Sequence, residues 1–127
     1  MRLGLYNACL LDWDLDRLFG WAAEHGYAAL ELHGGPRFRH VDWGSVADGR
    51  ENPVVDAQAR YLVRVCGLMY GPLNFLSPDP GERDAAFARL EVLLKAARRS
   101  EVPLVSTFTG RDPPIVTRAK SLVRGTT

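Results

Sequence analysis

The residues best suited to chemistry in this 127-residue chain are Glu31 and His33, which lie two positions apart in the apolar segment Tyr27–His33. Residues at this spacing share one face of a β-strand, while Leu30 and Leu32 occupy the other face. A carboxylate and an imidazole on the same face could bind a substrate or a metal ion, or transfer a proton. The structural alternative is that Glu31 forms a salt bridge and His33 lies in a solvated loop.

Three more polar residues accompany other apolar segments. Asn74 ends one of them, and Thr107 and Thr109 lie in another, Pro103–Thr109. Each side chain could hydrogen-bond a substrate hydroxyl, although Asn is also a turn residue and Thr a common strand residue. Strand alternation would place Val105, Thr107 and Thr109 on one face. We expect the Thr107 and Thr109 side chains to point to the same side of the sheet as those of Glu31 and His33.

Motifs for a complete metal centre or a nucleotide site are absent from the sequence. It contains no His-x-His, His-Glu-x-x-His or Cys-x-x-Cys, and metal sites need three or four converging ligands. It also has no Gly-x-Gly-x-x-Gly after the first apolar segment and no Walker-type Gly-Lys-Ser/Thr. A nucleotide-binding Rossmann domain is therefore disfavoured.

Short apolar segments alternate with segments of helical periodicity. Strands are expected at residues 2–9, 27–33, 68–74 and 103–109, and helices at 15–25, 53–66 and 82–100. Asp14 and Gly26 stand where the first helix needs its N-cap and its C′ glycine, and Pro53 opens the second helix. Residues 34–53 read as a long loop with a turn of helix near Asp42-Trp43. The last helix has an apolar stripe that is predicted to be buried, formed by Ala86, Phe87, Leu90, Leu93, Leu94 and Ala97.

This βαβαβαβ order predicts an α/β fold with parallel strands joined by right-handed crossovers. With the Rossmann fold disfavoured, the remaining common parallel architecture is the TIM barrel, which takes roughly 250 residues for eight βα units. Four strands within about 110 residues correspond to half of such a barrel. The fold expected here is therefore the first half of a TIM barrel, strands one to four, truncated.

Three segments carry a family resemblance. They are Met1-Arg-Leu-Gly-Leu followed by Leu18 to Leu32, then Asn74-Phe-Leu-Ser-Pro-Asp-Pro, and Pro103-Leu-Val-Ser-Thr-Phe-Thr-Gly-Arg-Asp-Pro. Together they resemble the xylose-isomerase-like TIM barrel superfamily, in particular its sugar phosphate isomerase/epimerase family. The resemblance covers residues 1–113 and implies the N-terminal half of that barrel. Residues 114–127 depart from the family pattern and are expected to be an atypical C-terminal tail.

The resemblance implies a function as well as a fold. Family members bind a small sugar or sugar phosphate and a divalent metal ion, with manganese, magnesium, zinc and cobalt not distinguishable here. A pair of glutamates then moves a proton next to a carbonyl. Those residues lie mainly on strands five to eight, so this chain is expected to be an inactive fragment without its own metal. Its expected substrate-binding residues are Glu31, His33, Asn74, Thr107 and Thr109.

Two alternatives remain open. A four-stranded half-barrel would expose two parallel sheet edges, which predicts a non-catalytic chain that self-associates. An abasic-site endonuclease-like, metal-dependent hydrolase on the same superfold fits less well, because such enzymes need lumen histidines on the middle strands and a basic DNA groove. The expected third and fourth strands contain no histidine.

Composition restricts the environment and the partners. The formal net charge of +1 argues against a nucleic-acid partner, and no apolar run approaches the roughly 20 residues of a membrane helix. Asp12, Asp14 and Asp16 interrupt the first apolar stretch before it reaches signal-peptide length. Cys9 and Cys66 fall in apolar segments and are interpreted as small buried residues, which fits a reducing cytoplasm.

Overall fold

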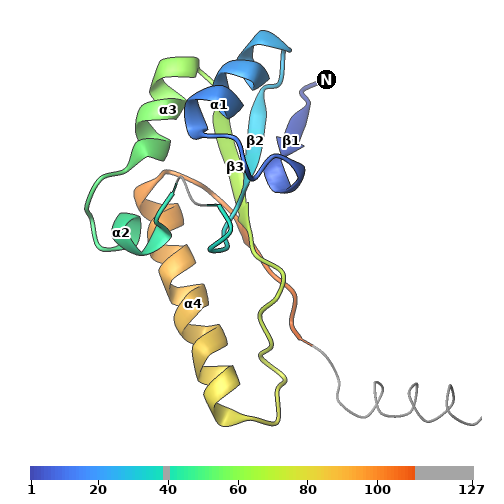
Figure 1. Ribbon diagram of the computed structural model, residues 1–127, viewed down its shortest axis with the longest axis vertical. Helices are drawn as coiled ribbons and strands as arrows, with labels where there is room; N and C mark the ends of the chain where they lie inside the picture. The colour runs from blue at the N-terminus through green and yellow to red at the C-terminus, as the bar shows by residue number, and fades with distance from the viewer. Residues whose placement is uncertain (39–40, 111–127) are drawn as a thin grey trace, which may run out of the picture.

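The computed structural model describes residues 1–38 and 41–110 and shows an α/β arrangement with one parallel sheet (Figure 1). The four strands lie in the order β1-β2-β3-β4, and each is parallel to its neighbour. They are β1 (Gly4–Tyr6), β2 (Ala29–His33), β3 (Arg64–Met69) and β4 (Val105–Ser106). The α/β class and the parallel sheet are confirmed, whereas the tail expected at 114–127 lies outside the described residues.

Helices connect successive strands and lie to one side of the sheet (Figure 1). They are α1 (Leu15–Glu24), α2 (Trp43–Ala47), α3 (Pro53–Tyr61) and α4 (Pro80–Arg99), with a 3₁₀ turn, η1 (Asn7–Cys9), directly after β1. The expected signals bound α1, because the Asp14 side chain accepts a hydrogen bond from the Arg17 N–H and Gly26 has a φ of +76°. The short helix expected near Asp42 is also present, with Asp42 as its N-cap.

The core lies between the helices and one face of the sheet. Leu30 and Leu32 of β2 are fully buried, as is Leu68 of β3. Residues from every helix join them, among them Leu18, Phe19, Trp43, Val54, Leu93 and Ala96. The other face of the sheet carries the alternate residues of each strand and is not covered by a helix (Figure 1).

The boundary between the second helix and the third strand was predicted wrongly. α3 ends at Tyr61 instead of continuing to residue 66, because Leu62 adopts the left-handed conformation with a φ of 56°. β3 then begins at Arg64, four residues earlier than expected. A register shift opposite Leu30/Glu31 accommodates one extra residue of β3, Cys66, as in a β-bulge.

Cys9 and Cys66 are both exposed, so their interpretation as buried residues was wrong. Cys9 ends the 3₁₀ turn η1, which replaces the second half of the strand expected at residues 2–9. Cys66 lies at the register shift of β3, where its Sγ contacts the Leu30 carbonyl oxygen at 3.4 Å. In both cases a local departure from regular strand geometry turns the thiol away from the core.

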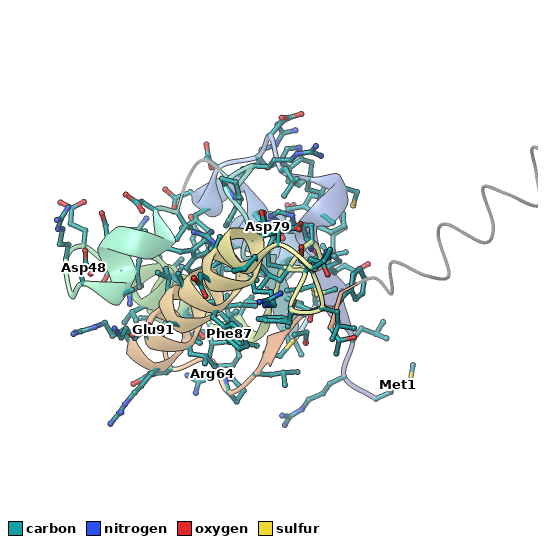
Figure 2. All side chains as sticks on the ribbon, turned by 90° about the horizontal axis from the view of Figure 1, so that it is seen from below. Met1, Asp48, Arg64, Asp79, Phe87 and Glu91 are labelled. Atoms are coloured by element: carbon teal, nitrogen blue, oxygen red, sulfur yellow. The ribbon has the colours of Figure 1, made fainter. Side chains whose placement is uncertain are left out.

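The apolar stripe of α4 is buried only in part. Ala86, Leu93 and Ala97 are buried as predicted, but Phe87 and Leu94 are exposed by 58% and 53%. Figure 2 labels Phe87 and Glu91 on neighbouring turns of this helix. Phe87 packs edge-on against Phe75 from the loop that precedes α4, with ring centroids 5.0 Å apart. The prediction that the whole stripe is buried was therefore wrong.

The C-terminal end of α4 is joined to α3 by hydrogen bonds, and those of Gln58 are buried. Gln58 donates to the Ser100 carbonyl oxygen and accepts from the Val65 N–H, both at 2.9 Å. Asn52, the N-cap of α3, donates to the Arg99 carbonyl oxygen at 3.1 Å. These bonds connect both helices to the start of β3.

Of the helices among residues 1–38 and 41–110, none is long and apolar enough to cross a membrane.

Candidate functional site

The uncovered face of the sheet carries the polar residues of the strands in two adjacent rows. Register pairs Tyr6 of β1 with Glu31 of β2, and Glu31 with Gly67 of β3. The next row toward the carboxyl ends contains His33 and Met69. Glu31 and His33 therefore share this face, as predicted from the alternation with leucines. Substrate sites of parallel α/β proteins lie at this end of the strands.

Glu31 lies between Tyr6 of β1 and Gly67 of β3, which has no side chain. The pKa of Tyr6 is raised, first because its phenol is partly buried and second because the Glu31 carboxylate lies nearby. On the other side, a Cβ placed on Gly67 would lie 3.3 Å from Glu31 Oε1, so the glycine leaves room for the carboxylate. Glu31 is the only carboxylate on the four described strands. The salt bridges among the described residues do not include Glu31.

His33 is held by contacts on several sides. Its Nδ1 accepts a hydrogen bond from the Gly35 N–H at 3.1 Å, which leaves the ring proton of the neutral form on Nε2. The ring packs edge-on against Tyr70, with centroids 5.9 Å apart. Its backbone carbonyl accepts from Trp43 Nε1 at 3.1 Å. His33 is thus ordered and half-buried, in contrast to the alternative of a solvated loop residue.

Burial lowers the pKa of His33, and the positive charges of Arg37 and Arg89 lower it further. Near neutral pH the imidazole is therefore uncharged and presents Nε2–H as a donor. Such a group suits a neutral, oxygen-rich ligand, because it can donate to a hydroxyl or carbonyl oxygen without a buried charge.

Asn7 is a functional candidate that is not among the five substrate-binding residues expected from the sequence. Its side chain is fully buried at the end of β1, and its Oδ1 accepts from the His33 N–H at 2.7 Å. That bond fixes the orientation of the amide, since only the oxygen can accept. The amide nitrogen, Nδ2, has no hydrogen-bond partner among the described residues. A buried donor without a partner is costly, and this one is enclosed by the protein, so Asn7 acts on the site through its Oδ1 and the His33 backbone.

Asn74 lies apart from the rows on the sheet. It lines a cavity of about 320 Å³ between the loop after β3 and the first half of α4, together with Tyr70, Leu73 and Arg89. Arg89 closes this region by donating to the Gly34 carbonyl oxygen at 2.5 Å and lying over the Tyr70 ring at 5.5 Å. Tyr70 therefore contacts both His33 and the cavity that contains Asn74.

The prediction that Thr107 and Thr109 lie on a strand face with Val105, pointing toward Glu31 and His33, was wrong. β4 spans only Val105 and Ser106, and Val105 pairs with the buried Leu68 and packs against the core. Ser106 is the residue that pairs with Met69 on the uncovered face. The two threonines follow the strand, and Thr107 Oγ1 donates to the Phe108 carbonyl oxygen at 3.2 Å, a local structural bond.

The described residues do not fit the divalent metal that the resemblance implies. Among residues 1–38 and 41–110, no group of three or more His, Cys, Asp or Glu side chains could hold a metal ion. Glu31 and His33 together supply at most two of the three or four ligands that such a site needs.

The chain matches no protein-family model, no curated protein and no solved structure. Its functional interpretation therefore rests on the geometry of the uncovered face.

Proposed function

We propose that the uncovered face around Asn7, Glu31 and His33 is one wall of a sugar or sugar phosphate site of the isomerase/epimerase type, built on the first four units of a TIM barrel. The observation that carries this proposal is the placement of a carboxylate and a neutral imidazole on one uncovered face near the carboxyl ends of parallel strands, with the buried Asn7 amide holding the His33 backbone. Active sites of TIM barrels lie at this end.

Each group has a role suited to a polyhydroxylated ligand. The Glu31 carboxylate would accept from a hydroxyl, and His33 Nε2 would donate to a hydroxyl or carbonyl oxygen, while the buried Asn7 amide keeps the His33 backbone in position. Tyr70, edge-on to His33, adds an aromatic surface for the apolar side of a sugar ring. Apart from the Glu31 carboxylate, the polar groups named here are neutral donors. This combination favours a ligand that carries hydroxyl groups.

Proton transfer next to a carbonyl needs a base on one side and an acid on the other. The described strands carry one carboxylate, Glu31. The proposal therefore assigns binding to this wall, and no turnover to these residues by themselves. An abasic-site endonuclease fits less well, because β3 and β4 carry no histidine.

Isothermal titration calorimetry with D-ribulose and D-ribulose 5-phosphate tests the proposal. We expect saturable millimolar binding that weakens about tenfold, or 1.4 kcal/mol, in Glu31→Gln and Asn7→Asp. Asn7→Asp keeps an oxygen that can accept from the His33 N–H and replaces the amide donor with a second carboxyl oxygen. Glu24→Gln, an exposed change on α1, is the matched control. Equal affinities in all four proteins, or no binding to either sugar, would refute the assignment.

A further inference from the structure

The two edges of the sheet present complementary backbone groups. Along β4, the carbonyl oxygens of Leu104 and Ser106 accept hydrogen bonds from the N–H groups of Leu68 in β3 and of Tyr70 directly after it, at 2.9 and 3.0 Å. In a parallel ladder the N–H and C=O groups of one residue point to the same neighbour, and those of the next residue point away. The backbone groups of Val105 and Thr107 therefore face outward from this edge.

The opposite edge is formed by β1. The Leu3 carbonyl oxygen accepts from the Ala28 N–H at 2.9 Å, so the backbone groups of Gly4 and Tyr6 point away from β2. Both edges thus offer donors and acceptors at every second residue, and both run in the same direction within the sheet. An edge of this kind is a template for a further parallel strand.

The side chains near the β4 edge are apolar and uncovered. Leu104 and Phe108 flank β4 and are exposed by 54% and 62%. Leu104 precedes Val105, which packs against the core, so Leu104 belongs to the face that also carries His33 and Met69, and Phe108 follows the strand next to Gly71. A sheet with one face covered by helices and exposed apolar side chains beside one edge favours a second layer or closure into a barrel.

We propose that two copies of this chain pair edge to edge, β4 of each beside β1 of the other, and close an eight-stranded parallel barrel. Four strands in sequential order are half of the number at which side chains just fill a barrel interior. A two-fold axis along the barrel would create two identical seams and leave no free edge. Leu104 and Phe108 of both copies would then lie in the interior.

Closure would also complete the site. The partner copy would bring a second set of Asn7, Glu31 and His33 to the same mouth, because all strands of the closed barrel run in one direction. This inference rests on the strand order and the edges, and does not depend on the ligand proposed above. A dimer that binds no sugar would refute the binding assignment alone, and a monomer that binds sugar would refute the pairing alone.

Solution mass and directed cross-linking test the pairing. Light scattering on the full chain at about 100 µM is expected to give twice its 14.1 kDa mass. Val105→Pro removes an outward N–H without removing a bond within the sheet, and is expected to give the single-chain mass with an unchanged circular dichroism spectrum. Val105→Ile is the control that keeps the edge. A single-chain mass for the unmodified protein, or an open series of higher masses, would overturn the proposal.

Cross-linking identifies the edges independently of Val105→Pro. In a background with Cys9→Ser and Cys66→Ser, Ser106→Cys is combined with Gly4→Cys or Tyr6→Cys. These two positions on β1 cover two alternative alignments of β1 with β4 of the other copy. A Cβ on Gly4 would meet its nearest neighbour at 3.6 Å, so that position accepts a side chain. At least one double variant is expected to convert most of the protein to a disulfide-linked dimer on mild oxidation. Dimers in the single variants, or none in either double variant, would contradict β4–β1 pairing.

Discussion

Gln58 joins α3, β3 and the end of α4, and its replacement by leucine should be costly. The side chain is 6% exposed and makes two hydrogen bonds of 2.9 Å, to the Ser100 carbonyl oxygen and from the Val65 N–H. Leucine has a similar volume but cannot replace either bond, so two buried backbone groups lose their partner. Each such loss costs about 1–3 kcal/mol, which gives a predicted loss of about 2–6 kcal/mol in the free energy of unfolding.

Urea denaturation followed by circular dichroism measures this loss. With an m-value of about 2 kcal/mol/M, the unfolding midpoint of Gln58→Leu should fall by about 1–3 M. Arg60→Leu on the same helix is the control, because its ion pair with Asp16 joins two side chains that are 63% and 65% exposed. An exposed pair contributes at most about 1 kcal/mol. A Gln58→Leu midpoint no lower than that of the control would refute the reasoning.

Three further predictions concern the local structure. Asp14→Ala removes the N-cap of α1 and should lower the free energy of unfolding by about 1 kcal/mol in a urea titration, whereas the exposed Asp12→Ala should leave it unchanged. In Gly35→Ala the added methyl group would overlap the His33 ring, so NMR titration should show the pKa of His33 returning toward its ordinary value; an unchanged titration would contradict the contact. In the unmodified protein the folded pKa of His33 is below its unfolded value of about 6.5. The contribution of His33 to the free energy of unfolding is therefore present above pH 6.5 and lost as the pH falls through the folded pKa. A titration midpoint of His33 at or above pH 6.5, measured by NMR in the folded protein, would contradict this direction.

Local signals predicted α1 and β2 of the first βαβ unit well. Asp14 and Gly26 bound α1 through interactions within a few residues, and Leu30 and Leu32 fix the faces of β2 by strict alternation. Glu31 and His33 could therefore be placed on one face from the sequence. The conformation of Leu62 had no such signal, since a left-handed leucine is uncommon, and the end of α3 was missed.

Features that depend on distant parts of the chain could not be predicted. Asn7 and His33 are 26 residues apart, and they meet because the chain folds into η1 directly after β1. Arg89 reaches the Gly34 carbonyl oxygen across 55 positions. The stripe of α4 indicated an apolar face, but its periodicity could not show that Phe87 would lie outside the core.

The most direct test of the binding wall is an NMR titration that follows the His33 ring while D-ribulose 5-phosphate is added at pH 7.5. At this pH the imidazole is neutral, so its Cε1–H resonance reports ligand contact rather than protonation. The account predicts a saturable shift of this resonance that is lost in Asn7→Asp and kept in Glu24→Gln. A His33 resonance that stays in place while the sugar binds elsewhere, or a shift of equal size in Asn7→Asp, would contradict it.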